Sequence, residues 1–339
     1  MHFKIFIILF LLLYQNSANS KTNDKYDFNQ KYLSNYFSAI VSSNNQKNDA
    51  AVKFFNSSKF LIDKHDNFLR NYVFSLVLNG EVKKAINQIK RSNTSNFFEA
   101  NLLLTLDSLT KKNYKQAKKR LNKLSTFQQS GTYEFVIIKT LESYIHLFLN
   151  QKVGKNNNNL GRIDLITNAF QNCYLNSKKT KSHFLNLINS QEGDYSRYLF
   201  FYLGNVINNR DYNRANEISK TIEPLKSSLL IAQAKKWIEE NNYNKFNHYF
   251  SCKVEKDLLA EFFFLISNLY SSQDNFKESN FFLNISNYLN PKFYFNLSLL
   301  AENYHLNDNF ILAKNILQKF NNQDEIYYWY KTKKITQFL

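Results

Sequence analysis

The sequence contains few of the residues that break helices or build tight turns. Its 339 residues include only six glycines and two prolines. A protein made of many short β-strands needs such turn residues at close intervals. Long segments with apolar residues at helical spacing, joined by short Asn, Asp and Lys connections, are present instead. The sequence therefore predicts an all-α protein.

Only two cysteines occur, Cys173 and Cys252, which is too few for a disulfide framework. One disulfide bridge between them can form in an oxidising compartment, although nothing in their spacing requires it. His248 lies one helical turn before Cys252, but two ligands on one helix face do not complete a metal site. We therefore predict no metal site and leave the pairing of the two cysteines undecided.

Motifs of common enzyme classes are also missing. Gly154 and Gly161 flank an asparagine run and open no phosphate-binding helix. The sequence contains no Gly-x-Ser-x-Gly elbow. Glu255 and Asp257 are expected to be solvated helix ends. We predict no catalytic residue and no cofactor.

Acidic residues are outnumbered by basic ones, 27 to 44, which gives a formal net charge of +17. The basic residues are spread along the chain apart from short runs such as Lys178-Lys179. The richness in Lys, Asn, Ile, Phe and Tyr is what AT-rich coding produces. We interpret the charge mainly as compositional background and expect no nucleic-acid partner.

A long apolar run occurs at the N-terminus, where Lys4 is followed by Ile5 to Leu13. Ala18-Asn19-Ser20 then places small side chains at the positions that a signal peptidase reads. This pattern predicts a signal peptide over residues 1–20, cleaved after Ser20, and a periplasmic or secreted protein. An uncleaved anchor is the alternative, which the cleavage site disfavours. Leu258 to Leu269 is too short and too polar to cross a bilayer.

A helix-turn-helix pattern recurs after this segment. A small residue early in each second helix lets the first helix approach, and an apolar residue four positions later fills the space beside it. Ser279 and Ala313 occupy equivalent positions 34 residues apart, which is the tetratricopeptide period. The seven small or equivalent positions are Ala51, Ala85, Ala117, Ala215, Phe246, Ser279 and Ala313, and the residues four positions later are Phe55, Ile89, Leu121, Ser219, Phe250, Leu283 and Leu317. The position three residues before the small one is aromatic in Tyr114, Tyr212, Tyr243, Phe276 and Phe310.

On these residues the chain resembles the tetratricopeptide-repeat family of exported bacterial type, from about Tyr32 to the C-terminus. Gly80 in the turn of NGEVKKA and Pro291 after a second helix match the family, whereas Phe246 and Ser219 depart from it. The resemblance implies a right-handed α-solenoid whose first helices line a concave binding surface. The residues expected on that surface are Phe201, Lys235, Asn268, Asn303 and Tyr304.

The repeats divide the chain into successive regions. A polar segment over 21–31 precedes repeats over 32–150, an irregular helical region with a polar insertion over 151–195, and further repeats over 196–339. The irregular region is flanked by a helix predicted over Tyr133 to Asn150 and contains two degenerate helices within Ile163 to Asn189. The last segment, Glu325 to Leu339, reads as the first helix of a repeat without its partner. It is either a capping helix, a helix that packs on a partner, or the truncated edge of a longer array.

The predicted function is that of an exported, non-enzymatic scaffold that binds a protein or peptide through its concave surface, in a role such as cell-envelope assembly. The alternative is a protein that binds envelope glycan or an anionic polymer through its basic charge, with peripheral envelope contact. Binding that weakens as salt rises would favour this alternative. The sequence leaves the partner and the oligomeric state open.

Overall fold

The computed structural model describes residues 30–65, 67–92, 96–154, 160–190, 196–320 and 325–337. Within these residues the structure contains eighteen α-helices, three short 3-10 helices and no strand, which confirms the all-α prediction. The α-helices are α2 (Gln30–Asn44), α3 (Asn48–Ser57), α4 (Phe68–Leu78), α5 (Val82–Arg91), α6 (Phe98–Thr110), α7 (Tyr114–Leu124), α8 (Tyr133–Asn150), α9 (Arg162–Tyr174), α10 (Thr180–Ile188), α11 (Arg197–Asn208), α12 (Tyr212–Lys220), α13 (Leu229–Glu239), α14 (Asn244–Tyr249), α15 (Glu255–Ser271), α16 (Phe276–Leu289), α17 (Leu297–Leu306), α18 (Phe310–Leu317) and α19 (Glu325–Gln337). The 3-10 helices are η1 (Lys59–Leu61), η2 (Ser125–Phe127) and η3 (Tyr294–Asn296).

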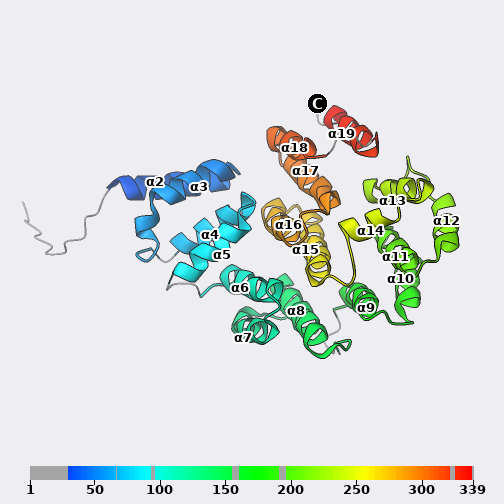
Figure 1. The fold of residues 1–339 in the computed structure, drawn as a ribbon. Coiled ribbons are helices and arrows are strands. Elements are labelled where there is room, and N and C mark those ends of the chain that lie inside the picture. The colour runs from blue at the N-terminus through cyan, green and yellow to red at the C-terminus, as the bar shows by residue number, and fades with distance from the viewer. Residues whose placement is uncertain are drawn as a thin grey trace, which may run out of the picture.

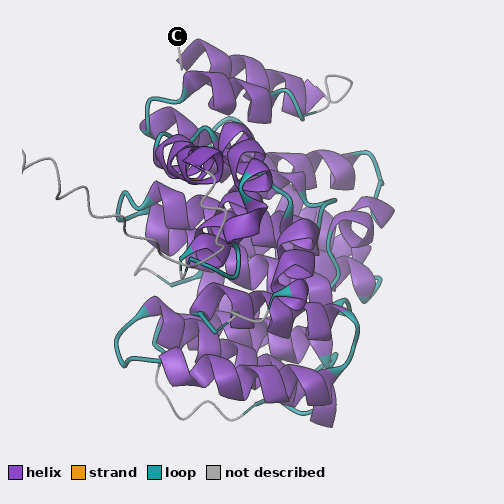
Figure 2. Cartoon of the chain, turned by 90° about the vertical axis from the view of Figure 1, so that its left-hand side faces the viewer, coloured by secondary structure: helices purple, strands orange, loops and turns teal. Residues whose placement is uncertain are grey.

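Neighbouring helices pack as pairs joined by short turns, as Figures 1 and 2 show. The tightest pairs are α2 with α3, α4 with α5, α6 with α7, α15 with α16, and α17 with α18. The predicted repeat positions explain this pairing. All seven small or equivalent residues lie in the second helix of a pair, and they and their followers four residues later are all buried. The seven-fold pattern therefore describes real contacts between paired helices.

The turns inside these pairs share one backbone geometry. In all seven, the residue five positions before the small residue has a left-handed conformation, with φ between 55° and 76°. These residues are Gln46, Gly80, Lys112, Arg210, Asn241, Asp274 and Asp308. In the turn at Gly80, the Gly80 amide donates to the Val77 carbonyl and the Glu81 amide donates to the Leu76 carbonyl. This is the Schellman arrangement, which satisfies carbonyls at the end of the first helix.

Phe246 departs from the small-residue pattern, and the structure shows how its bulk fits. Its side chain is 1% exposed and stacks on Phe200 of α11, with ring centroids 5.2 Å apart. Gly204, one turn further along α11, faces the same ring, and a Cβ there would lie 3.7 Å from Phe246 Cδ1. The missing side chain on α11 therefore makes room for a large one on α14.

The α15–α16 pair lies at the centre of the molecule, beside α4 and α8 (Figure 1). Phe74 of α4 stacks on Phe281 of α16, with ring centroids 4.7 Å apart. The Asn284 side-chain amide donates to the Leu78 carbonyl over 3.3 Å. A later pair thus occupies the inner side of the N-terminal repeats and joins segments about 200 residues apart in the sequence.

The irregular region forms the helices that the sequence predicts. α8 spans Tyr133–Asn150, and α9 and α10 form a pair within residues 162–188. A disulfide joins Cys173, in the last turn of α9, to Cys252, just before α15, which settles the open pairing. Next to it, the Tyr174 hydroxyl donates to Glu255. These bonds fasten α9 to the start of α15.

A buried ionic network joins α11, α15 and the η3 segment. The Arg197 guanidinium donates to both carboxylate oxygens of Glu261, each over 2.7 Å, and to the side-chain Oδ1 of Asn296 over 2.6 Å. The guanidinium carbon lies 3.8 Å from the Phe264 ring centroid. The Glu261 residue is 2% exposed, and burial raises its pKa against the lowering by Arg197. Because a buried carboxylate needs a partner, this network depends on both charged residues.

The last helix, α19, packs against α13 and α18. Tyr327 and Tyr330 are buried there, while Tyr328 remains 55% exposed. Over the part of the chain that the structure describes, no helix is both long enough and apolar enough to cross a membrane. The predicted signal peptide over residues 1–20 lies outside the described residues.

Candidate functional site

Two of the five residues predicted to line a concave binding surface are enclosed by the protein. Phe201 is 2% exposed and packs on Phe250, with ring centroids 4.5 Å apart. Asn303 is fully buried, and its amide donates to the Ser279 hydroxyl over 2.8 Å. Both side chains hold helices together and present no atoms to a partner.

The other three predicted residues lie in different places. Tyr304 lines a cleft between the two ends of the chain, and Lys235 lines a second cleft between α13 and α19. Asn268 is exposed on α15. The structure does not bring the five together, because the α15–α16 pair occupies the inner side of the N-terminal repeats.

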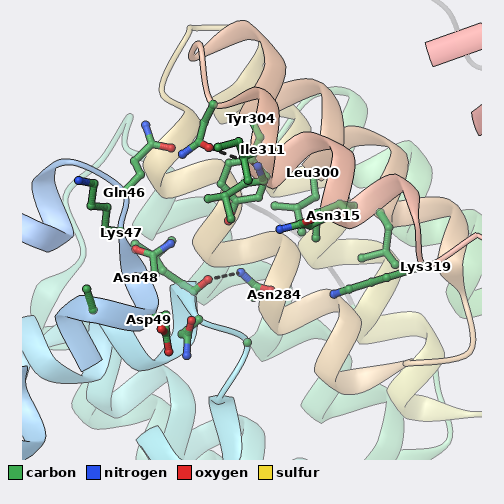
Figure 3. A pocket seen from close by; sticks show the side chains of 18 of the residues that line it. Gln46, Lys47, Asn48, Asp49, Asn284, Leu300, Tyr304, Ile311, Asn315 and Lys319 are labelled. Carbon is green, nitrogen blue, oxygen red and sulfur yellow. Dashed lines mark hydrogen bonds between the residues drawn. The ribbon is translucent and has the colours of Figure 1, made fainter. Parts of the chain in front are cut away.

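The larger of the two clefts has a volume of about 680 Å³ and lies between the N-terminal repeats and α16–α18 (Figure 3). Gln46 to Asp49, in the α2–α3 turn and the start of α3, form one wall, and Ile311 and Asn315 of α18 lie on the other with Lys319, which follows α18. Leu300 and Tyr304 of α17 contribute buried apolar surface. This volume is within the usual range of ligand-binding clefts.

Asparagine dominates the polar lining, so we call this space the amide cleft. Its asparagines come from five segments of the chain and are Asn45, Asn48, Asn79, Asn284, Asn287, Asn309 and Asn315. Each carboxamide offers one acceptor oxygen and two donor hydrogens, the groups that pair with the N–H and C=O of a peptide backbone. The lining contains no histidine, cysteine or serine, and its one carboxylate, Asp49, is paired with Lys53 over 2.7 Å. The cleft is therefore better equipped to bind than to catalyse.

Asn48 has an unsatisfied acceptor in this lining. The residue is 8% exposed, and its buried Oδ1 accepts no hydrogen bond within the described residues. Burial raises the pKa of the neighbouring Tyr304 hydroxyl to about 12. A hydrogen bond with the Asn48 side chain lowers this pKa in part. Leaving a buried acceptor unpaired costs about 1–3 kcal/mol.

The amide cleft carries a positive charge at its edges. Lys47 and Lys319 are exposed on opposite walls (Figure 3), and neither pairs with an acidic side chain among the described residues. Since Asp49 is already paired, the two lysines are not neutralised by the lining itself. Acidic groups on a ligand are therefore favoured at both edges.

The second cleft has a volume of about 370 Å³ and is more apolar. Leu225 and Trp329, which line it, are 78% and 39% exposed. Lys235 donates to the Ser219 carbonyl over 3.0 Å and pairs with Glu239 over 2.9 Å. Its ammonium is thus engaged within the protein.

Other residues singled out in the sequence have structural roles. Cys252 is in the disulfide and is not available to form a metal site with His248. No group of three or more potential metal-ligating side chains occurs within the described ranges. The expectation that Glu255 and Asp257 are solvated is wrong. Glu255 accepts hydrogen bonds from Tyr114 and Tyr174, and Asp257 accepts one from the Ser251 amide over 2.8 Å.

Comparison of the chain with known proteins finds no relative. No family model matches the chain, and no curated protein or solved structure is significantly similar to it. The case for function therefore depends on the geometry above.

Proposed function

We propose that this chain is an exported, right-handed α-solenoid of the tetratricopeptide type that binds an extended segment of a protein partner in its amide cleft. It acts as a scaffold and performs no catalysis. The observation that carries the proposal is a cleft of about 680 Å³ whose lining includes seven asparagines.

The repeated helix pairs support the family assignment. Seven pairs share a buried small or equivalent residue and a left-handed turn residue five positions before it. A recurring unit at this spacing is what defines a helical repeat array.

The disulfide supports export. Cys173 and Cys252 are 4% and 7% exposed, so their bond belongs to the core. Structural disulfides persist in the periplasm and outside the cell but are rare in the reducing cytosol. This agrees with the signal peptide predicted over residues 1–20.

The chemistry of the amide cleft favours a polypeptide ligand. Carboxamides from several helices can pair with successive backbone N–H and C=O groups of an extended segment, as in other modes of peptide recognition. The buried surface of Leu300 and Tyr304 can accept an apolar side chain, and Lys47 and Lys319 can attract acidic ones. We therefore expect bound segments to combine an apolar residue with acidic neighbours.

The experiment is a selection from a randomised peptide display library against the purified protein, followed by fluorescence anisotropy with the recovered peptides. Asn48→Ala and Asn315→Ala should each weaken binding about 5- to 10-fold, since each removes a hydrogen bond worth about 1 kcal/mol. Asn268→Ala is the matched control, because Asn268 is exposed on α15 and lies outside the amide cleft. Its binding constant should equal that of the wild type.

Two results would contradict the proposal. The library could yield no binder, or recovered peptides could bind all three variants equally. Peptides that lose affinity on Trp329→Ala and not on Asn48→Ala would instead place the site in the cleft between α13 and α19.

A further inference from the structure

The positive charge of this protein is concentrated on two helices. Residues 81–123 contain eleven lysines and arginines and three carboxylates, a net charge of +8 out of +17 for the whole chain. α5 and α7 carry nine of these cations and no acidic residue. We call the eleven cations the basic face: Lys83, Lys84, Lys90, Arg91, Lys111, Lys112, Lys115, Lys118, Lys119, Arg120 and Lys123. Basic residues are thus denser in this region than in the rest of the chain.

The amphipathic pattern of α5 and α7 directs these cations outward. The two helices bury only small and aliphatic residues: Val82, Ala85, Ile86, Ile89, Ala117, Leu121 and Leu124. All cations of the basic face are exposed except Arg120, which is half-buried. Asp107, on α6, accepts from Lys90 over 2.6 Å and from Lys111 over 2.9 Å. Because Lys90 lies in the last turn of α5 and Lys111 in the turn before α7, this carboxylate links the cations of the two regions.

The nearby carboxylates leave most of this charge unneutralised. Glu81 pairs with Lys84, and Glu99 pairs with Arg70. Asp107 forms ion pairs with both Lys90 and Lys111. The other eight cations of the basic face have no acidic partner within the described residues. Eight like charges on adjacent turns repel one another, so an external anion would stabilise this arrangement.

The side chains of the basic face indicate the kind of partner. Nine of the eleven are lysines, which act as point charges and lack the bidentate geometry of arginine. None of the strongly exposed large apolar side chains of the described structure lies on α5 or α7. The face therefore offers neither a wedge for insertion into a bilayer nor rings for stacking on sugars or bases. Diffuse attraction to an extended anionic layer fits these features.

We propose that the basic face attaches the protein peripherally to the surface of an anionic lipid bilayer. Exposed lysines on α5 and α7, which both pack on α6, can approach a planar layer of headgroups together, and each contributes to adsorption through the negative surface potential. A flexible soluble polymer would be better held in a groove, and the residues of the basic face line neither of the two clefts described above. This attachment is independent of the binding proposed for the amide cleft.

The test is co-sedimentation of the purified protein with vesicles of phosphatidylcholine containing phosphatidylglycerol, at low and high salt. The variant replaces Lys115, Lys118, Lys119 and Lys123 of α7 with Gln. The matched control replaces Lys220, Lys245, Lys314 and Lys333, which are exposed in the C-terminal half, with Gln. Both variants lose four charges, and far-UV circular dichroism confirms that both are folded.

We expect the wild type to bind anionic vesicles at low salt and to be released at high salt. Each lysine near an anionic surface raises the membrane partition coefficient about fivefold. The α7 variant lacks four lysines, so it should bind at least about 100-fold more weakly. The control should lose less than about tenfold, because charges beyond the screening length contribute little.

Three results would overturn the proposal. The wild type could fail to bind anionic vesicles, or the two variants could lose binding equally, which would make net charge the cause. Binding to soluble dextran sulfate that depends on the α7 lysines, without vesicle binding, would assign the basic face to an anionic polymer instead.

Discussion

The ion pair between Arg197 and Glu261 allows a quantitative test of how the core is held. Replacing Arg197 with Met keeps much of the side-chain volume but leaves Glu261, which is 2% exposed, without its cation. Burial then raises the pKa of this carboxyl further, since Arg197 was the cause that lowered it. The carboxyl can avoid a buried charge by binding a proton. The folded state will therefore hold a proton that the unfolded state releases.

The loss of stability can be calculated from the free energy needed to keep the Glu261 carboxyl protonated. Holding a carboxyl neutral costs about 1.4 kcal/mol for each pH unit above its ordinary pKa of 4.5. The folded state of the Arg197→Met variant binds more protons than the unfolded state, so its stability is greatest below that pKa and falls as pH rises. Between pH 5 and 7 the variant should lose up to about 3 kcal/mol of stability through this carboxyl. The loss relative to wild type is smaller, because burial already raises the pKa of Glu261 in the wild type. Breaking a buried pair costs about 3–5 kcal/mol in total, which sets the upper limit.

The assay is urea unfolding followed by far-UV circular dichroism at pH 5, 6 and 7. Glu261→Gln is the matched control, because it removes the titrating carboxyl and should therefore lack the loss of stability with rising pH that Arg197→Met shows. Replacing both partners with Met and Leu should restore part of the stability, since neither charge is then left unpaired. A loss for Arg197→Met that does not change with pH would refute the reasoning, because Glu261 would then not be a buried carboxyl that depends on Arg197.

Three further predictions concern the turns, the disulfide and a helix terminus. Arg210→Gly should stabilise the protein by about 0.5–1 kcal/mol and Gly80→Ala should destabilise it by about 1 kcal/mol, because both positions are left-handed; equal unfolding midpoints in urea would contradict this. Replacing Cys173 and Cys252 with Ala should cost about 2–5 kcal/mol, since the bond closes a loop between residues 79 positions apart; thermal unfolding that dithiothreitol leaves unchanged in the wild type would show that the bond contributes nothing. Burial raises the pKa of Asp257 to about 6, so the protein should lose about 1–3 kcal/mol of stability as pH rises from about 4 to 6. Asp257→Asn should remove that part of the pH dependence, and an identical pH profile for this variant would disprove the assignment.

The helix pairs were predictable from the sequence because they are local. A small residue followed four positions later by an apolar one records a contact between neighbouring helices, and this signal survives even where Phe246 or Ser219 departs from it. The turns were harder to recognise. Of the seven left-handed residues only Gly80 is a glycine, so the strongest turn signal was missing from the others.

The amide cleft could not be predicted because it depends on how distant segments pack. Asn48 and Asn309 sit next to turns, where asparagine is common for local backbone reasons and carries no functional signal. They belong to one site only because the α15–α16 pair contacts α4 and thereby brings the two ends of the array together. The same packing explains why Asn303 is buried and not on a binding surface. The basic face does not stand out in the net charge of the whole chain, because its cations become one surface only when α5 and α7 turn their apolar residues inward.

The most direct measurement of the central proposal is site-specific photo-crosslinking from the rim of the amide cleft, in the cells that produce the protein. Benzoylphenylalanine would replace Ile311, which lines the cleft and is 76% exposed, or Tyr328 on α19 as a control outside it. We predict one discrete protein adduct from position 311, its loss when Asn48→Ala is combined with that label, and no such adduct from position 328. No adduct at position 311, or the same adduct from both positions, would contradict the proposal that the amide cleft binds the partner.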